Sequence, residues 1–471
     1  MSEPKEIVEL TTRQFLYRFG VLLFASVAAG LAGGLLGLEL HQQVACAVFL
    51  SIVIGTLLFW NFRLAIAFLG ISVLVITKSL NIPHFVESSA LPVILFLVGM
   101  MIIVGALRDL GFFTWVVQSI VEMPHMTGTR FVVAVSIVSA LLACAVDEVT
   151  SIIFTTTLVF QVCDRLKLNP APYVIICVLC TNTGSSGTML GNPVGIYIGA
   201  KAGLTFLDFL VWAFPIMTVA LGTTLGITLL WYRRELREFD VRLEERLNRH
   251  LSLAPRVDVP YKRGLALLAA TVVFIASHHY LERVFGLDTN SILLVAPLAC
   301  AGMIMIVRRD RARHYVEHEV DWWTLLFFMM LFAVAGTLEY SGVTGLFAQS
   351  FTRHFGESLF VLVPLITAVS AIGSAFVDNV IFVAAFSPVI EELSANVHAM
   401  PLWWGLLYGA CLGGNITLIG STANIVALGM LEKHYRAHVR FLDWLLVGGL
   451  TAVVACTIAC VAVLALSQWM P

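Results

Sequence analysis

The chain has 471 residues, of which 59% are hydrophobic and only 12% are charged, and its formal net charge is −2. Soluble domains carry about 25% charged residues, whereas several runs here are almost free of charge over roughly 20 residues, the length that crosses a bilayer core as a helix. This composition excludes a soluble globular protein. The net charge argues neither for nor against a nucleic-acid partner, and we expect none. The absence of a G-x4-G-K-[ST] motif argues against ATP-driven transport within this chain.

The predicted elements are membrane helices separated by polar or glycine-rich breaks. The polar stretch Met1–Arg13 precedes an apolar run that is too long for the core of a signal peptide, so we expect that run to remain as a helix. Two segments, 130–164 and 357–395, each hold two apolar arms around an acidic break, and we expect re-entrant hairpins there. The expected spans in chain order are 17–38, 43–60, 63–80, 89–107, 171–200, 206–232, 263–281, 289–307, 321–342, 402–431 and 440–469.

Basic residues predict the orientation, because cytoplasmic loops are enriched in Lys and Arg. The 233–263 loop carries nine Lys or Arg residues, and Arg308–Arg313 and Lys433–Arg440 are also basic. All three lie in the cytoplasm only if each two-armed segment enters and leaves on one side. The N-terminus is then cytoplasmic and the C-terminus outside. The pairs Trp322-Trp323 and Trp403-Trp404 fit aromatic anchors at the membrane interface.

Internal repetition is the most specific signal in the sequence. Val146-Asp147-Glu148-Val149 interrupts the first pair of arms, and Val377-Asp378-Asn379-Val380 interrupts the second. About forty residues after each aspartate comes a glycine-rich break, which reads GSSGTMLGNPVGI at 184–196 and GGNITLIGSTANI at 413–425. Both breaks fit G-x3-T-[ML]-[LI]-G-x4-I, and the matched positions are offset by 229 to 231 residues. The chain therefore consists of two homologous halves.

Each half holds three helices, a hairpin, a broken helix and a final helix, and an odd number of crossings relates the two. One half is then inverted relative to the other, an arrangement in which discontinuous helices form a site near the middle of the membrane. The linker pattern from Arg234 to His250 predicts an amphipathic helix, interpreted as part of a solvated connector, with a regulatory domain as the alternative. The expected domains are 1–39 (cytoplasmic N-terminus and an extra first helix), 40–232 (first inverted repeat), 233–262 (cytoplasmic linker) and 263–471 (second inverted repeat).

The two breaks are candidates for substrate binding because unwound backbone cannot face lipid, where each unpaired N–H or C=O costs several kcal/mol. Glycine permits the unwinding, and Pro193 cannot donate to a helical ladder. The free carbonyls can hold a cation and the free amides an anion. Neutral side-chain oxygens add to this cage, from Thr188, Thr417, Asn415, Ser421 and Asn424.

The acids of the two tips are the exceptional residues. A carboxylate in the membrane interior costs about 3 kcal/mol even on the gentler insertion scale, so Asp147, Glu148 and Asp378 are functional candidates. The alternative is that the tips lie shallow and the acids only cap helices, as Asp147 before Thr150 would. A carboxylate that alternately holds Na⁺ and H⁺ couples the two ions, whereas three carboxylates repel an anionic substrate unless bound cations cancel their charge.

The motifs resemble the ion-transporter superfamily, in particular its arsenite-permease and sodium–proton-antiporter (ArsB/NhaD) branch with a citrate-transporter-like domain, and within it the P protein group. The resemblance is carried by AFVDNV at 375–380 and GACLGGNITLIGSTAN at 409–424, and it covers the chain from about residue 40. It implies an all-α membrane protein of about eleven transmembrane helices with two re-entrant hairpins and two broken helices. It further implies a homodimer that works by an elevator-like alternation, with the tips and the breaks lining the substrate site.

The first half departs from the family pattern. Its tip reads Asp147-Glu148 where relatives more often have Asp-Asn, and its break reads Gly191-Asn-Pro-Val-Gly195 where relatives have Gly-Asp-Pro-Pro-Asn. Compared with relatives, the break thus lacks an Asp and an Asn that could act as ligands, and the tip gains Glu148. The ion that this chain carries can therefore differ from that of its relatives. The Ser-Asn-Thr tips of the di- and tricarboxylate carriers are absent, which counts against an organic anion. The candidate substrate- and ion-binding residues are Asp147, Glu148, Thr150, Asn182, Gly184, Thr188, Gly191, Asn192, Asp378, Asn379, Asn415, Thr417, Gly420, Ser421 and Asn424.

We therefore predict a secondary active transporter, not an enzyme, that exchanges a cation, Na⁺ in the first place, for H⁺. Asp147 and Asp378 are the candidate Na⁺ ligands, and no cofactor is expected. The alternatives are a carrier of arsenite, another oxyanion or a citrate-type organic anion, and a channel-like anion conductance. The expected partners are the small inorganic ion, H⁺, membrane lipid and a second copy of the chain. The expected location is multi-pass in a bacterial inner (plasma) membrane.

Overall fold

The computed structural model describes residues 11–35, 37–247, 261–287, 291–436 and 439–470. The first ten residues of the predicted cytoplasmic N-terminus, residues 248–260 of the predicted linker and part of the Lys433–Arg440 loop lie outside the described residues. Every regular element in the described ranges is helical, which confirms the all-α prediction. The chain forms two compact units, each of which takes segments from both predicted halves.

Nine helices in the described part of the chain are long and apolar enough to cross a membrane, or ten if a pair bent by 55° counts as one span. A multi-pass membrane protein follows from this count. The nine include three arms of the predicted hairpins, so both the number of complete crossings and the re-entrant course of the hairpins stay predictions.

The smaller unit comprises residues 1–91 and 322–350. Within it α1 packs on α2, and α2, α3 and α4 pack against α18. Arg63, at the start of α3, is buried with its guanidinium over the rings of Trp60 and Phe327, at 4.0 and 4.7 Å. Its helices are α1 (Thr12–Leu35), α2 (Leu40–Leu58), the 3-10 turn η1 (Trp60–Phe62), α3 (Arg63–Ile76), α4 (Ile82–Ser88), α18 (Trp322–Tyr340) and most of α19 (Val343–Phe355).

The larger unit comprises residues 92–321 and 351–471. Its first part contains the arms of the first hairpin and the first broken helix, at positions close to those expected. The helices of this part are α5 (Leu91–Asp109), α6 (Phe112–Val121), α7 (Gly128–Ala145), α8 (Glu148–Leu166), α9 (Ala171–Ser185), α10 (Pro193–Ala202), α11 (Phe206–Asp208), the π-helical turn η2 (Phe209–Ala213), α12 (Phe214–Trp231) and α13 (Arg233–Leu247).

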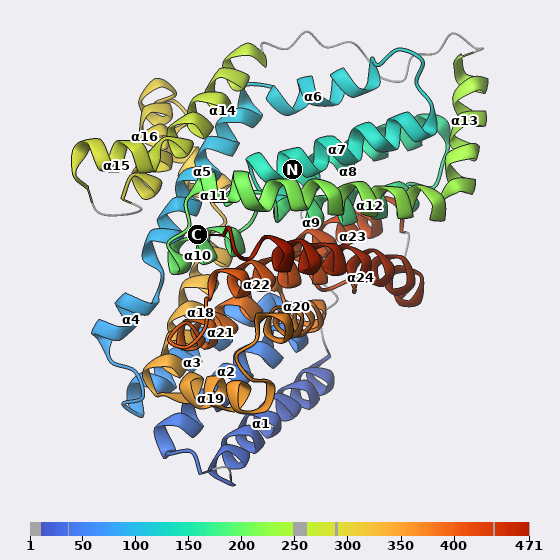
Figure 1. Cartoon of the computed structure of the whole chain (residues 1–471). Coiled ribbons are helices and arrows are strands. Elements are labelled where there is room, and N and C mark those ends of the chain that lie inside the picture. The colour runs from blue at the N-terminus through green and yellow to red at the C-terminus, as the bar shows by residue number, and fades with distance from the viewer. Residues whose placement is uncertain (1–10, 36, 248–260, 288–290, 437–438, 471) are drawn as a thin grey trace. The chain divides into compact units, whose positions relative to one another are not determined.

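The remainder of the larger unit repeats the hairpin and the broken helix. Here α20 packs on α21 and α22, while α12 and α24 run side by side (Figure 1). The helices are α14 (Tyr261–Ala276), α15 (His278–Phe285), α16 (Ser291–Val307), α17 (Ala312–His314), the π-helical turn η3 (Tyr315–Glu319), α20 (Leu359–Phe376), α21 (Asn379–Leu393), α22 (Met400–Gly413), α23 (Thr422–Tyr435) and α24 (Phe441–Leu466). The short helices α4, α6, α15 and α19 had no counterpart among the sequence predictions.

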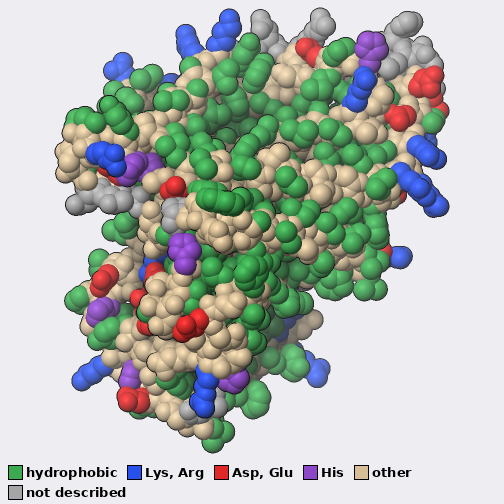
Figure 2. Space-filling view, in the orientation of Figure 1, with side chains coloured by type: hydrophobic (Ala, Val, Ile, Leu, Met, Phe, Trp, Pro, Cys, Tyr) green, Lys and Arg blue, Asp and Glu red, His purple; other side chains and the backbone are tan. Residues whose placement is uncertain are grey.

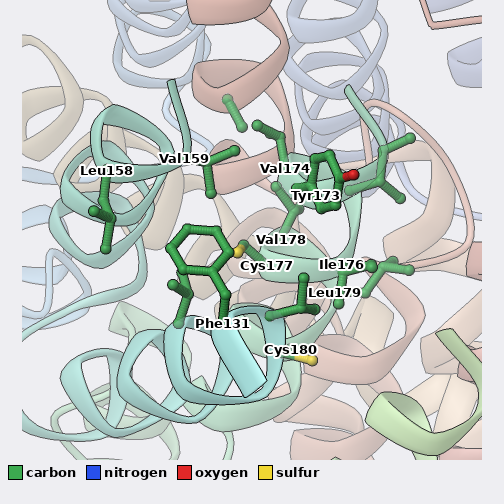
Figure 3. Close-up of a cluster of buried hydrophobic side chains, with 14 of the residues drawn as sticks. Phe131, Leu158, Val159, Tyr173, Val174, Ile176, Cys177, Val178, Leu179 and Cys180 are labelled. Carbon is green, nitrogen blue, oxygen red and sulfur yellow. The ribbon is translucent and has the colours of Figure 1, made fainter. Parts of the chain in front are cut away.

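A hydrophobic core holds the first hairpin against the first broken helix. Figure 3 shows Phe131 of α7, Leu158 and Val159 of α8 and Tyr173 of α9 in this cluster. Cys177 and Cys180 of α9 belong to it as buried free thiols, so the Cys-x-x-Cys spacing here is part of helix packing. This core fixes the two arms that carry the first tip and the helix that leads to the first break.

The two halves make the same contacts at equivalent positions. Thr188 donates its hydroxyl hydrogen to the carbonyl of Cys144, and Thr417 donates to the carbonyl of Ala375. A Cβ built on Gly184 would lie 2.5 Å from the backbone of Ala140, and one on Gly413 would lie 2.4 Å from that of Ala371. These matched contacts support the predicted homology of the halves, and the inverted insertion stays a prediction.

The linker helix α13 is helical as predicted but is not wholly solvated. Leu236, Phe239 and Leu243 are at most 5% exposed, and the ring of Phe239 lies 5.2 Å from that of Phe131. Charged side chains gather along the edge that α13 occupies, whereas hydrophobic side chains cover much of the face over α12 and α24 (Figure 2). The interpretation as a solvated connector is therefore wrong for the packed face of α13.

The tryptophan pairs differ from each other in their surroundings. Trp322 and Trp323 are 42% and 46% exposed, as interfacial anchors would be. Trp403 and Trp404 are only 3% and 0% exposed. The second pair is therefore part of the protein interior, because α22 is covered by α20, α21 and α24.

Candidate functional site

The first tip is built by a helix end and a new helix start. Helix α7 ends at Ala145, and Asp147 caps α8 by accepting a hydrogen bond from the backbone N–H of Thr150 at 2.7 Å. A capping aspartate satisfies an N–H that has no partner within the helix. Glu148 follows as the first residue of α8, and its own N–H donates to the carbonyl of Gly191 at 3.1 Å. This bond ties the tip to the first break.

The first break separates α9 from α10. Asn192 begins α10 by accepting from the N–H of Gly195 at 3.0 Å, and Pro193 follows in the first helical position, where no N–H is needed. The amide of Asn192 donates to Ser185 Oγ at 2.9 Å and to Cys411 Sγ at 3.1 Å. Because Cys411 lies on α22, this side chain connects the first break to the second broken helix.

The second tip and the second break have the corresponding construction. Asp378 caps α21 through the N–H of Val380 at 3.0 Å, and Ser421 caps α23 through the N–H of Ala423 at 3.2 Å. The hydroxyl of Thr422 donates to Asp378 Oδ2 at 2.7 Å. Thus Asp378 is bonded to both the second tip and the second break.

Asn182 joins the two broken helices. Its Nδ2 donates to Asn415 Oδ1 at 2.9 Å and to Asn424 Oδ1 at 2.7 Å. The amide of Asn415 returns to the Leu179 carbonyl at 3.1 Å, and that of Asn424 donates to the carbonyls of Gly414 and Thr417 at 2.8 and 2.9 Å. All three asparagines are at most 1% exposed. This buried amide network holds the unwound segments in register.

The network ends at Glu148. Ser421 Oγ lies 3.2 Å from Asn182 Oδ1 and 3.3 Å from Glu148 Oε1. Glu148 is 4% exposed, and its Oε2 has no hydrogen-bond partner among the described residues. An unpartnered buried oxygen on an acid is costly.

The other two acids lie near this carboxylate. Glu148 is within electrostatic reach of both Asp378 and Asp147, and Asp147 is within reach of Arg108. Asp378 is buried, whereas Asp147 is half-buried. Like charges in a poorly solvated region repel strongly, so the mutual repulsion of the three acids is a main electrostatic feature of this region.

The structure brings the predicted residues of both halves into one region of the larger unit. Thr150 and Asn379 lie at the helix starts, Thr188 and Thr417 anchor the breaks to the hairpins, and Gly191 and Gly420 allow the chain to pass close to backbone. In both breaks the glycine has no room for a Cβ, which would lie 2.1 Å from the carbonyl oxygen of Ser185 at Gly191 and 2.7 Å from that of Gly414 at Gly420. Thr188 and Thr417 thus use their hydroxyls to anchor the breaks, and Gly191 permits the close approach of the backbone.

Sequence reasoning missed three polar residues of the site: Ser185, Cys411 and Thr422. Ser185 and Asn192 lie beside the Glu148 carboxylate, and Cys411 is within its electrostatic reach. Thr422 carries a hydroxyl next to the predicted Ser421, and Ser185 lies within the first glycine-rich break, so proximity to the motifs was the available signal. Cys411 lies within the run 409–424 that carries the family resemblance, which was the available signal for this residue.

The donor set suits a hard cation better than a transition metal. Among the described residues, no group of three or more His, Cys, Asp and Glu side chains is arranged to hold a metal ion. The surroundings of Glu148 and Asp378 instead offer carboxylate, hydroxyl and amide oxygens, which are the ligands that hard cations prefer.

Comparison with known proteins gives concordant matches. The family model described as "Citrate transporter" matches residues 48–409. An uncharacterized transporter from Mycobacterium tuberculosis is 32% identical over 346 residues, which is 72% of this chain and 78% of the relative. The human P protein is 26% identical and covers 80% of this chain, which spans only 54% of the P protein. The predicted resemblance, and the expectation of a transporter rather than an enzyme, are confirmed.

A solved structure supports the fold. The crystal structure of the YdaH transporter from Alcanivorax borkumensis matches with a TM-score of 0.54, covering 82% of this chain and 87% of that chain. The sequence identity is 15%, so this likeness concerns the fold alone.

Proposed function

Because this chain belongs to the citrate transporter family and is a secondary transporter, we propose that it exchanges a cation, Na⁺ in the first place, for protons. Glu148 and Asp378 are the groups that carry the proton or hold the cation, and Asp147 adds a third carboxylate at the rim. The amide network of the breaks supplies the frame.

The observation that carries this proposal is the state of Glu148. One of its oxygens accepts a hydrogen bond from Ser421, and the other is buried, has no hydrogen-bond partner within the described part of the chain and lies near a second buried acid, Asp378. Removing one partner of a buried charge is strongly destabilising. A carboxylate in this position is therefore satisfied either as the protonated acid or with a cation on its free oxygen, and the two states exclude each other.

This mutual exclusion is what couples the two ions. When Na⁺ binds the free oxygen, the proton leaves, and when the cation departs, the proton returns. Neither ion needs a separate site, and a cycle in which the site crosses the membrane with the cation and returns with the proton would exchange them. The elevator-like movement, the homodimer and the cytoplasmic N-terminus belong to the same proposal.

A citrate-type anion carrier is the second candidate, and the family match favours it. The N-terminal ends of α10 and α23, which carry the positive end of the helix dipole, are suited to an anion. Three acids in the same region oppose a polycarboxylate, however, unless cations bind first. In that case Na⁺ would travel with the anion rather than against the proton. Arsenite, a neutral oxyacid at neutral pH, would meet no such repulsion.

The deciding experiment uses the full-length protein in proteoliposomes. A Na⁺ gradient is imposed, and lumenal pH is followed with a trapped dye. We expect Na⁺-dependent proton movement that is reduced at least tenfold in Glu148→Gln and Asp378→Asn, because an amide cannot exchange a proton for a cation. Asp310→Asn is the matched control, since Asp310 is exposed and only loosely paired with Arg308 at 3.8 Å.

The outcomes separate the candidates. Proton movement that is independent of Na⁺, or unchanged in both site variants, contradicts the exchange mechanism. Uptake of labelled citrate or arsenite that requires Na⁺, without an opposing proton flux, supports the anion carrier. Ion flux that follows the voltage without coupling supports a channel-like conductance.

A further inference from the structure

A groove lies along α7, away from the region of the three acids. A groove of about 540 Å³ is lined by the turn between α6 and α7 and by α7 itself. Its walls are almost entirely apolar and include Met123, Met126, Val133 and Ile137. Met123 and Ile137 are 43% and 39% exposed. The groove therefore presents apolar surface to whatever surrounds α7.

One charged residue lines this groove, Arg130 in the first turn of α7. Its Nη1 donates to the carbonyl of His125 at 2.8 Å, which holds the guanidinium near the turn. None of the ion pairs between described residues involves Arg130. The nearby acids are bonded elsewhere: Glu122 accepts from Gln118 at 3.0 Å, and Asp240 accepts from the N–H of Gly128 at 2.5 Å.

We propose that this groove binds an anionic phospholipid, with the headgroup phosphate on Arg130 and an acyl chain along α7. The planar guanidinium is suited to a phosphate, which it can bind through two parallel hydrogen bonds. From Arg130 to Ile137 the helix rises by about 10 Å at 1.5 Å per residue, enough to contact the upper part of one acyl chain. Arg130 and the apolar surface of α7 thus lie in the same order as the headgroup and the acyl chain of a phospholipid.

A second groove in the larger unit lacks the charged residue that distinguishes the α7 groove. It lies between α20 and α24, has a volume of about 390 Å³ and is lined by residues such as Ala371, Ile372 and Val453 without any charged side chain. In the second half, Val361 occupies the place that corresponds to Arg130 by the 231-residue offset of the hairpins. Acyl chains can fill both grooves, but only the α7 groove selects an anionic headgroup. The basic-residue distribution predicts that this groove opens to the cytoplasmic leaflet.

Native mass spectrometry of the purified full-length protein tests the proposal. The probes are phosphatidylglycerol and phosphatidylcholine, added in turn at equal concentration. We expect the wild type to retain phosphatidylglycerol preferentially, Arg130→Lys to retain much of this preference and Arg130→Gln to bind phosphatidylglycerol about fivefold more weakly, in line with the contribution of one basic residue near an anionic surface. Ile137→Trp keeps the charge but fills the groove, and it should weaken binding as well.

The matched control is Arg313→Gln, because Arg313 is an exposed arginine that pairs with Glu317 in a different segment. Equal losses in Arg313→Gln and Arg130→Gln would mean diffuse electrostatic attraction and would overturn the proposal. Unchanged binding in Arg130→Gln would overturn it too. Displacement by glycerol phosphate in millimolar amounts would show that the site takes a free phosphate rather than a lipid. Melting curves of each variant establish that it is folded.

Discussion

At the scale of single residues, the site depends on side chains that have no freedom to move independently. Asn182 contacts Asn415, Asn424 and Ser421, so one amide of the first half holds three residues of the second half. Each bond is buried, and a partner left alone would be costly. The precision of the site therefore comes from this network of buried hydrogen bonds, whereas Glu148 Oε2 has no hydrogen-bond partner among the described residues.

Substitution of two glycines tests whether the matched contacts of the two halves contribute equally to stability. Gly184→Ala and Gly413→Ala each place a methyl group about 2.5 Å from backbone of the neighbouring hairpin arm, at Ala140 and Ala371. Overpacking of this kind costs about 1–3 kcal/mol, so we expect both variants to melt several degrees below the wild type and to transport more slowly. The measurement is thermal unfolding in detergent, followed by the flux assay.

Gly222→Ala is the control for the two glycine variants. A Cβ at Gly222 meets nothing within 4 Å, so alanine should leave stability unchanged or raise it by up to about 1 kcal/mol through helix propensity. A normal melting temperature in only one of the two variants would mean that the matched contacts do not have the same role in the two halves.

At the scale of elements, α13 is more than a connection between the halves. Asp240 accepts from the first turn of α7, Arg246 donates to the Arg165 carbonyl in the last turn of α8 at 3.0 Å, and Tyr173 of α9 donates to the Glu235 carbonyl at 2.8 Å. Asp240 thus lies at the N-terminus of α7 and Arg246 at the C-terminus of α8, which is the placement of negative and positive side chains that the helix dipoles favour. Thus α13 fastens the base of the first hairpin to α9.

Phe239 is the residue on which this fastening depends. Its ring is fully buried, 5.2 Å from Phe131 and 5.7 Å from Tyr173. We expect Phe239→Ala to destabilise the protein by about 3–5 kcal/mol, the usual cost of such a cavity, and Phe239→Leu by less. Val241→Ala on the same helix is the control, since Val241 is 57% exposed. Chemical or thermal unfolding measures the effect, and an unperturbed Phe239→Ala protein would mean that α13 is not docked in solution.

Many of the helices and their positions could be predicted from the sequence. The two arms predicted at 130–164 are observed as helices α7 and α8 between Gly128 and Leu166, because hydropathy and capping residues act locally. What could not be predicted depends on distant contacts. Nothing local shows that Trp404 would be buried under three other helices, or that the apolar face of α13 would find Phe131. In the same way, the motifs located the site, but the bond from Asn182 to Asn424, 242 positions apart, could not be inferred from either motif alone.

At the scale of the whole molecule, the compact units do not coincide with the predicted repeats. The smaller unit takes residues 1–91 from the first half and 322–350 from the second, and the larger unit holds both hairpins and both broken helices. All the candidate site residues therefore belong to one unit. If the transporter works by an elevator-like movement, as we propose, the site would travel intact, and no hydrogen bond of the asparagine network would need to break.

The predicted inversion of one half relative to the other can be tested by the side of the membrane on which two exposed loops lie. Asn169 lies between α8 and α9, and Asn396 lies at the corresponding place between α21 and α22; both are exposed. Inversion places them on opposite sides of the membrane, with Asn169 in the cytoplasm according to the basic residues. With the partly exposed Cys46, Cys456 and Cys460 replaced by serine, we expect a membrane-impermeant maleimide to label Asn396→Cys in intact cells and Asn169→Cys only after lysis. Labelling of both positions from the same side would mean parallel halves. The two tips would then reach the membrane from the same face, and the pairing of Glu148 with Ser421 across the halves would lose its topological basis.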